Sequence, residues 1–168
     1  MHSPFVFDFI LSVLNNRQGY APPTQIEALR QKLLADVTEI IIEDLGAGSR
    51  IGTTKKRKVH KIAATAVKPK KWSHFLYRLV AHYEPQTIIE LGTSLGISTA
   101  YIAAAYPQAN IYTIEGSSAI QQLAVQHFKA LGCNNIQSHV GNFDAQLPAL
   151  LSNMATVDLA YIDGNHRY

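Results

Sequence analysis

The chain of 168 residues is long enough for one domain with a buried core, and its 47% hydrophobic content is typical of globular proteins. No apolar run is long enough to cross a bilayer, so we expect no membrane partner, and the apolar N-terminus carries Asp8 without a basic leader, which favours a buried helix over a signal peptide. The single cysteine, Cys133, excludes a disulfide within these residues and a zinc site built on thiolates, and it favours a cytoplasmic location.

Positive charge is concentrated in one short stretch. Nine of the 15 basic residues lie between Arg50 and Lys71, and no acidic residue occurs between Asp44 and Glu84, which leaves six basic residues against 12 acidic ones elsewhere. Residues 50–71 could form a solvated helix face, contact an anionic substrate, or bind the phosphates of a nucleic acid. The net charge of +3 is therefore a poor guide to partners.

The first half of the chain predicts mainly helices. Ser3-Pro4 and Thr24 are suitable starts for two of them, and Pro85 ends the last. The predicted elements are helices at 4–16 and 24–35, a short strand at 38–43, a weakly periodic helix at 54–66 and an amphipathic helix at 71–83.

The second half alternates strands with helices. Strands are predicted at 87–91, 110–114, 136–140 and 157–162, and helices at 97–106, 118–131 and 145–152. This order predicts an α/β fold with a doubly wound, Rossmann-like parallel sheet in the spatial order 3-2-1-4, covered by helices on both faces. We expect two portions, an N-terminal helical one over residues 1–84 and a Rossmann-like cofactor-binding one over residues 85–168.

Two glycine turns compete as the cofactor loop, DLGAGS at 44–49 and ELGTSLG at 90–96. Only the second follows a strand, precedes a helix, and is followed by an acid at the end of the next strand, Glu115. There Gly92 and Gly96 would let the backbone approach a ligand, and Glu115 could accept hydrogen bonds from both ribose hydroxyls. The turn at 44–49 is left as either a lid over the site or a plain connection.

The residues from Glu90 onward resemble class I S-adenosylmethionine (SAM)-dependent methyltransferases, in particular small bacterial O-methyltransferase-like proteins. Four motifs occur in the order of that family, over residues 87–168. They are residues 90–96 after the first strand, Glu115 after the second, Gly141-Asn142 after the third, and residues 158–166 around the fourth.

A dinucleotide-dependent dehydrogenase is the weaker interpretation of the same loop. Such enzymes use G-x-G-x-x-G, and the spacing from Gly92 to Gly96 lacks the middle glycine that lets the backbone reach a pyrophosphate. Because SAM has no pyrophosphate, the absence of that glycine favours SAM.

The resemblance implies roles for individual residues. Glu90 would hold the cationic methionine end of SAM, directly or through water, unless it is only a carboxylate at a strand end. Glu115 would bind the ribose, and Asn142 with Phe143 would contact the adenine, although Asn142 could be an ordinary turn residue. The implied cofactor-binding set is Glu90, Gly92, Thr93, Ser94, Gly96, Glu115, Gly116, Asn142, Phe143 and Asp163.

Asp163 and His166 are the predicted catalytic residues. In similar O-methyltransferases an aspartate at the position of Asp163 binds a divalent metal, such as Mg²⁺, that acts as a Lewis acid on the acceptor oxygen. The other ligands in that family come from the next strand, so the metal is a hypothesis here. His166 could be a general base or a histidine that only holds its loop.

The expected reaction is methyl transfer from SAM to an oxygen of a small-molecule acceptor, which the sequence does not identify. A complete methyltransferase sheet has further strands, so we expect that the chain is C-terminally truncated and binds cofactor without turnover, or that a homodimer covers the edge at 157–162. The alternative is a non-catalytic α/β domain that binds nucleic acid or protein through residues 50–71.

Overall fold

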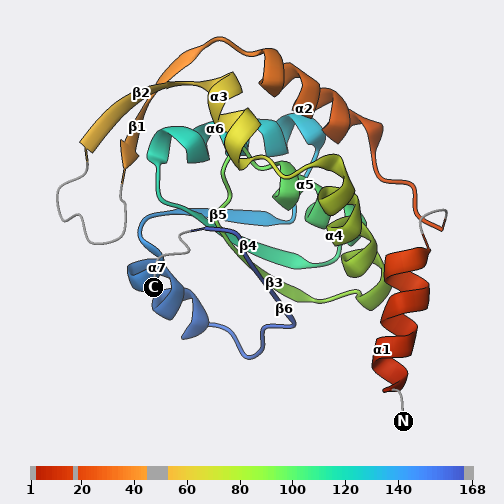
Figure 1. Ribbon diagram of the computed structural model, residues 1–168. Coiled ribbons are helices and arrows are strands. Elements are labelled where there is room, and N and C mark those ends of the chain that lie inside the picture. Colours follow the sequence, from red (N-terminus) through yellow and green to blue (C-terminus); the bar gives the residue numbers. More distant parts are fainter. Residues whose placement is uncertain (1–2, 17–18, 45–52, 165–168) are drawn as a thin grey trace.

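The structure is a computed structural model that describes residues 3–16, 19–44 and 53–164. Figure 1 shows an α/β core with a two-stranded hairpin beside it and a helical N-terminal segment at one end. The elements are α1 (Pro4–Asp8), η1 (Phe9–Asn15), α2 (Thr24–Ala35), β1 (Glu39–Asp44), β2 (Thr53–Lys58), α3 (Val59–Ala66), α4 (Lys70–Tyr83), β3 (Thr87–Leu91), α5 (Ile97–Ala105), β4 (Asn110–Glu115), α6 (Ser118–Leu131), β5 (Ile136–Val140), α7 (Phe143–Leu151) and β6 (Leu159–Ile162).

The central sheet has four parallel strands in the order β5-β4-β3-β6, which confirms the predicted order 3-2-1-4. Glu90 near the end of β3 lies opposite Thr113 of β4 and Tyr161 of β6. Glu115 and Asp163 each follow two residues later, so their carboxylates flank the loop that leaves β3. This edge is where open α/β sheets bind ligands.

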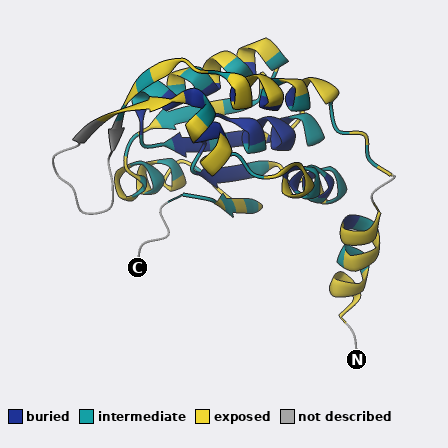
Figure 2. Cartoon of the chain, turned by 45° about the horizontal axis from the view of Figure 1, so that its top comes forward, coloured by how far each residue is buried: buried dark blue, intermediate teal, exposed yellow. Residues whose placement is uncertain are grey.

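Helices cover both faces of the sheet because successive strand residues point to opposite sides. Ile88 packs with Leu76 of α4 and Ile102 of α5. Its neighbour Ile89 packs with Leu147 and other apolar residues of α7 on the opposite face. Figure 2 shows that buried residues concentrate in the sheet and in the helices against it.

A second layer of helices extends the core. Ile26 of α2 and Ile62 of α3 form one buried cluster with Ala100 and Tyr101 of α5. This cluster fixes the segment after α3 beside the ligand-binding edge of the sheet.

The hairpin β1–β2 corrects the helix predicted at 54–66. Residues 54–58 are part of β2, which pairs antiparallel with the isoleucine-rich β1, and the helix begins only at Val59. Ile40 and Ile42 of β1 pack against the helical core, and β1 contacts α6. Pairing with a β-branched strand therefore overrides weak helical periodicity. The hypothesis that residues 50–71 form a single solvated helix face is wrong.

The N-terminal segment is less buried than expected. Of the large apolar side chains that the structure describes in residues 3–16, only Val13 is buried, whereas Phe5, Phe7 and Leu11 are at least half exposed. The segment packs one side against α4, where Arg78 Nε donates to the Val13 carbonyl oxygen at 2.7 Å. Among the described residues, no helix is both long enough and apolar enough to cross a membrane.

Candidate functional site

A small cleft, open to solvent, lies at the carboxyl edge of the sheet. Its described lining consists of residues 66–68 at the end of α3, residues 92–98 from the loop after β3 into the start of α5, and Asp163 after β6. The cleft therefore joins the predicted glycine loop, residues 92–96, to a segment that no sequence motif indicated.

The glycine loop takes its shape from three residues with left-handed backbone angles. Gly92 has φ +103°, Ser94 has φ +48° and Gly96 has φ +81°. A Cβ on Gly92 would lie 2.9 Å from the backbone nitrogen of Gly164, so only glycine lets β3 and β6 end in contact. A Cβ on Gly96 would lie 2.5 Å from the ring of Phe128, so this glycine permits the packing of α6 behind the loop.

Glu115 is held by two backbone amides at the end of β4. Its Oε2 accepts a hydrogen bond from Ser94 N at 2.8 Å, and its Oε1 accepts one from Ser117 N at 3.0 Å across Gly116. The hydroxyl oxygens of Ser94 and Ser117 are buried without a hydrogen-bond partner in the described part of the chain. Buried polar atoms normally have partners, so these two hydroxyls, on the same serines whose amides hold Glu115, are candidates to bind a polar ligand such as a ribose. The described lining of the cleft includes Ser94 but neither Ser117 nor Glu115.

Glu90 lies beneath the cleft and is wholly buried. Three hydroxyls donate to its carboxylate, from Ser98 at 2.8 Å, Thr99 at 2.5 Å and Thr113 at 2.7 Å. Thr93, a predicted cofactor residue, is also buried, and its hydroxyl lies 2.6 Å from that of Thr113. Of the residues that contact the Glu90 carboxylate, Ser98 also lines the cleft.

Burial raises the pKa of Glu90 from 4.5 to about 7, and the negative charge of Asp163 adds to this rise. The three hydroxyl donors oppose it. The hydrogen bonds therefore offset only part of the cost of burying the charged carboxylate. A positive charge in the cleft would favour the charged form.

Asn142 and Phe143 lie at the same sheet edge, but the described lining of the cleft includes neither. Asn142 is exposed, and its Oδ1 accepts a hydrogen bond from Asp144 N at 2.9 Å, which caps α7. This cap makes α7 begin at Phe143, two residues before the predicted start. Phe143 packs with the apolar side chains of the α7 face, against Gly164.

Asp163 uses both carboxylate oxygens. Lys68 Nζ lies 2.6 Å from Oδ1, and Tyr161 OH donates to Oδ2 at 3.1 Å. Burial and the nearby charge of Asp163 raise the pKa of Tyr161, so this phenol stays a donor at neutral pH. Lys68 is a cleft residue that the sequence reasoning missed, because it counted only as one member of the basic stretch.

The described residues do not fit the proposed divalent metal. Within residues 3–16, 19–44 and 53–164, no three His, Cys, Asp or Glu side chains converge, although hard cations require several oxygen ligands. Asp163 instead pairs with a lysine. His166 and most of the turn at 44–49 lie outside the described residues.

Comparison with known proteins shows which family the second half of the chain resembles. Residues 89–168, slightly less than half of the chain, match a family model described as a methyltransferase domain. A search of curated protein sequences finds no match. This stretch of the chain is thus similar to methyltransferase domains.

Solved structures with the same fold include complexes with SAM or its demethylated product, S-adenosylhomocysteine (SAH). The O-methyltransferase TomG from Streptomyces achromogenes, involved in tomaymycin synthesis and solved with SAM, is 25% identical with a TM-score of 0.57 over 60% of this chain and 46% of TomG. SAH-bound methyltransferase PaMTH1 from Podospora anserina is 14% identical, with a TM-score of 0.66 over 98% of this chain and 60% of that one. An O-methyltransferase from Bacillus cereus in complex with SAH is 17% identical, with a TM-score of 0.64 over 95% of this chain and 60% of that one.

The chain spans 46% to 60% of the length of these three proteins. The similarity to PaMTH1 and to the Bacillus cereus protein, both below 25% identity, establishes a shared fold. The fold is therefore that of SAM-dependent methyltransferases.

Proposed function

We propose that this chain is the cofactor-binding part of a SAM-dependent methyltransferase that transfers a methyl group to an oxygen of a small molecule. The observation that carries the proposal is Glu115, whose carboxylate is fixed beside the glycine loop by the backbone amides of Ser94 and Ser117. The buried hydroxyls of these two serines have no hydrogen-bond partner among the described residues. The methyltransferase-domain match over residues 89–168 and the likeness to TomG support the same assignment.

In this proposal different residues contact different parts of the cofactor. Glu115 accepts from the ribose hydroxyls, while the glycine loop and the first turn of α5 approach the rest of the molecule. Glu90 acts through Ser98, because its own carboxylate is wholly buried. Phe143 and Asn142 lie at the adenine side of the edge, where Asn142 also keeps its role as the cap of α7.

Bound SAM supplies a methyl group on a positively charged sulfur, which an acceptor oxygen can attack in line. The chain contributes mainly by fixing the reacting groups, since alignment alone can provide a large part of the rate enhancement. His166 remains the proposed general base, and Asp163 lies at the sheet edge where the acceptor would enter. We include no metal step, because the described donor set does not fit one.

The proposal favours a small acceptor over a nucleic acid. The described basic residues of the stretch at 50–71 are divided between β2, α3, the cleft, where Lys68 lies, and the start of α4. They do not form a single helix face that could bind phosphates.

We also propose that a homodimer covers the sheet edge, since β6 is the terminal strand of the described sheet and Ile162 is 59% exposed.

Isothermal titration calorimetry of the 168-residue chain tests this function. We expect SAM and SAH each to bind at one site, and NAD⁺, the dinucleotide control, to produce no binding heat. A folded chain that binds NAD⁺ but not SAH would overturn the proposal. A gel-shift titration with RNA and DNA at low salt tests the nucleic-acid alternative, which predicts a shift where we expect none.

A further inference from the structure

Lys68 places a positive charge in the cleft, directly opposite Asp163. It lies between α3 and α4, far in sequence from the glycine loop, and its Nζ is 2.6 Å from Asp163 Oδ1. The side chains of Lys68 and Asp163 are 39% and 14% exposed, so the pair is accessible from the lysine side. Both residues line the cleft with residues 92–98.

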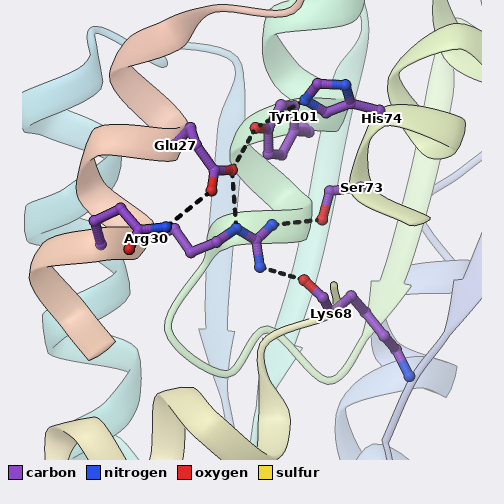
Figure 3. A network of polar contacts seen from close by, with 7 residues as sticks. Glu27, Arg30, Lys68, Ser73, His74 and Tyr101 are labelled. Carbon is purple, nitrogen blue, oxygen red and sulfur yellow. Dashed lines mark hydrogen bonds and ion pairs between the residues drawn. The ribbon is translucent and has the colours of Figure 1, made fainter. Parts of the chain in front are cut away.

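A buried guanidinium fixes the main chain of Lys68. Arg30 of α2 is only 6% exposed, and its Nη1 donates a hydrogen bond to the Lys68 carbonyl oxygen. Its Nη2 donates to Ser73 Oγ at 2.8 Å, and its Nε donates to Glu27 Oε2 at 3.1 Å. Figure 3 shows this network, with the Lys68 side chain extending away from Arg30. The backbone is thus anchored from the protein interior, while only the flexible side chain reaches the cleft.

Asp163 is held in a similar way from its own side. Tyr161, two residues earlier on β6, donates to Oδ2 and leaves Oδ1 for a cation. The cleft therefore presents one partly exposed cation beside one less exposed anion. Close to them, α5 begins at Ile97 without a side-chain cap on its first amides.

This arrangement is complementary to an α-amino acid, which carries one ammonium and one carboxylate on the same carbon. We propose that Lys68 and Asp163 together recognise the zwitterionic methionine end of the cofactor. When the ligand enters, its ammonium replaces Lys68 at Asp163, and Lys68 turns to its carboxylate. Each charged group keeps an opposite partner during this exchange, so neither is left in the cleft without one. The inference rests on the proposed function, that is, on SAM binding in this cleft.

Comparing two ligands distinguishes recognition of the amino acid end by Lys68 from a general effect of Lys68 on the shape of the cleft. SAH carries the ammonium and carboxylate, whereas 5′-methylthioadenosine keeps the adenosine and the sulfur but lacks the amino acid. Calorimetry would compare both ligands on the 168-residue wild type, on Lys68→Met, and on the matched control Lys70→Met, which removes the same charge from an exposed position at the start of α4.

We expect Lys68→Met to lose about 10-fold to 100-fold in affinity for SAH, the size of a charge-assisted hydrogen bond, with little change for methylthioadenosine. Lys70→Met should match the wild type for both ligands, and Lys68→Arg should recover part of the SAH affinity. Thermal unfolding of Lys68→Met without ligand checks that it folds, which we expect because Arg30 holds the backbone rather than the side chain of Lys68.

An equal loss for both ligands would overturn the inference and leave Lys68 as a residue that only shapes the cleft. Unchanged SAH affinity in Lys68→Met would overturn it as well, without affecting the proposed cofactor site. If the folded wild type binds neither ligand, the proposed function fails, and the inference fails with it.

Discussion

Replacing Glu90 with glutamine should change how the stability of the protein depends on pH. Burial raises the pKa of Glu90 to about 7, so near neutral pH the folded protein contains a carboxylate that is poorly compensated when ionised. Glutamine has nearly the same shape and carries no charge. The hydroxyls of Ser98, Thr99 and Thr113 can accept from it as well as donate.

The size and direction of the effect follow from the pKa of Glu90. The folded protein binds this proton more tightly than the unfolded chain, so its free energy of unfolding decreases as the pH rises from 4.5 to about 7 and then stays level. Each pKa unit corresponds to about 1.4 kcal/mol, which gives a loss of ~3 kcal/mol. Glu90→Gln should escape this loss, so its advantage over the wild type should be absent near pH 4 and ~3 kcal/mol at pH 8.

Urea denaturation followed by circular dichroism, at intervals from pH 4 to pH 8.5, measures this difference. Glu84→Gln makes the same chemical change at an exposed turn and should follow the wild type within about 0.5 kcal/mol. If the wild type and Glu90→Gln give parallel curves over the whole range, burial does not act on Glu90 as we describe.

Three further substitutions test the loop, the ribose site and the buried network. Gly92→Ala should reduce the free energy of unfolding by about 1–3 kcal/mol, because Gly92 has φ +103° and an added Cβ would collide with the backbone of Gly164. An unchanged urea midpoint would refute the close approach of Gly92 to Gly164. Glu115→Ala should weaken SAH and methylthioadenosine by a similar factor, about 10-fold to 100-fold by calorimetry, since both contain the ribose; equal binding to the wild type would remove Glu115 from the site. Arg30→Met should reduce the free energy of unfolding by about 3 kcal/mol, as Glu27 then lacks its ion-pair partner; no loss in urea denaturation would mean that the network adds nothing.

The sheet could be predicted because its signals are local. Each strand is a short apolar run between turn residues, and the alternation with helices leaves few topologies for a parallel sheet. The position of Glu115 follows from the same pattern, since it directly ends the second strand. The structure confirms the strand order and places Glu115 beside the glycine loop.

Other features depend on contacts that no local pattern contains. Residues 54–58 form a strand only because β1 pairs with them, and a sequence of lysines and arginine carries little strand propensity of its own. Lys68 reaches Asp163 from the other half of the chain through the anchor at Arg30. The depth of Glu90 was also not predictable, because its motif specifies a carboxylate at a strand end and not how completely α5 covers it.

A crystal structure of the 168-residue chain grown with SAH would decide most directly whether the cleft is the cofactor site. We predict that the ribose hydroxyls lie within hydrogen-bond distance of the Glu115 carboxylate, with the amino acid end between Ser98 and the Lys68–Asp163 pair. SAH bound outside this edge of the sheet, with Glu115 still occupied only by the amides of Ser94 and Ser117, would contradict the assignment.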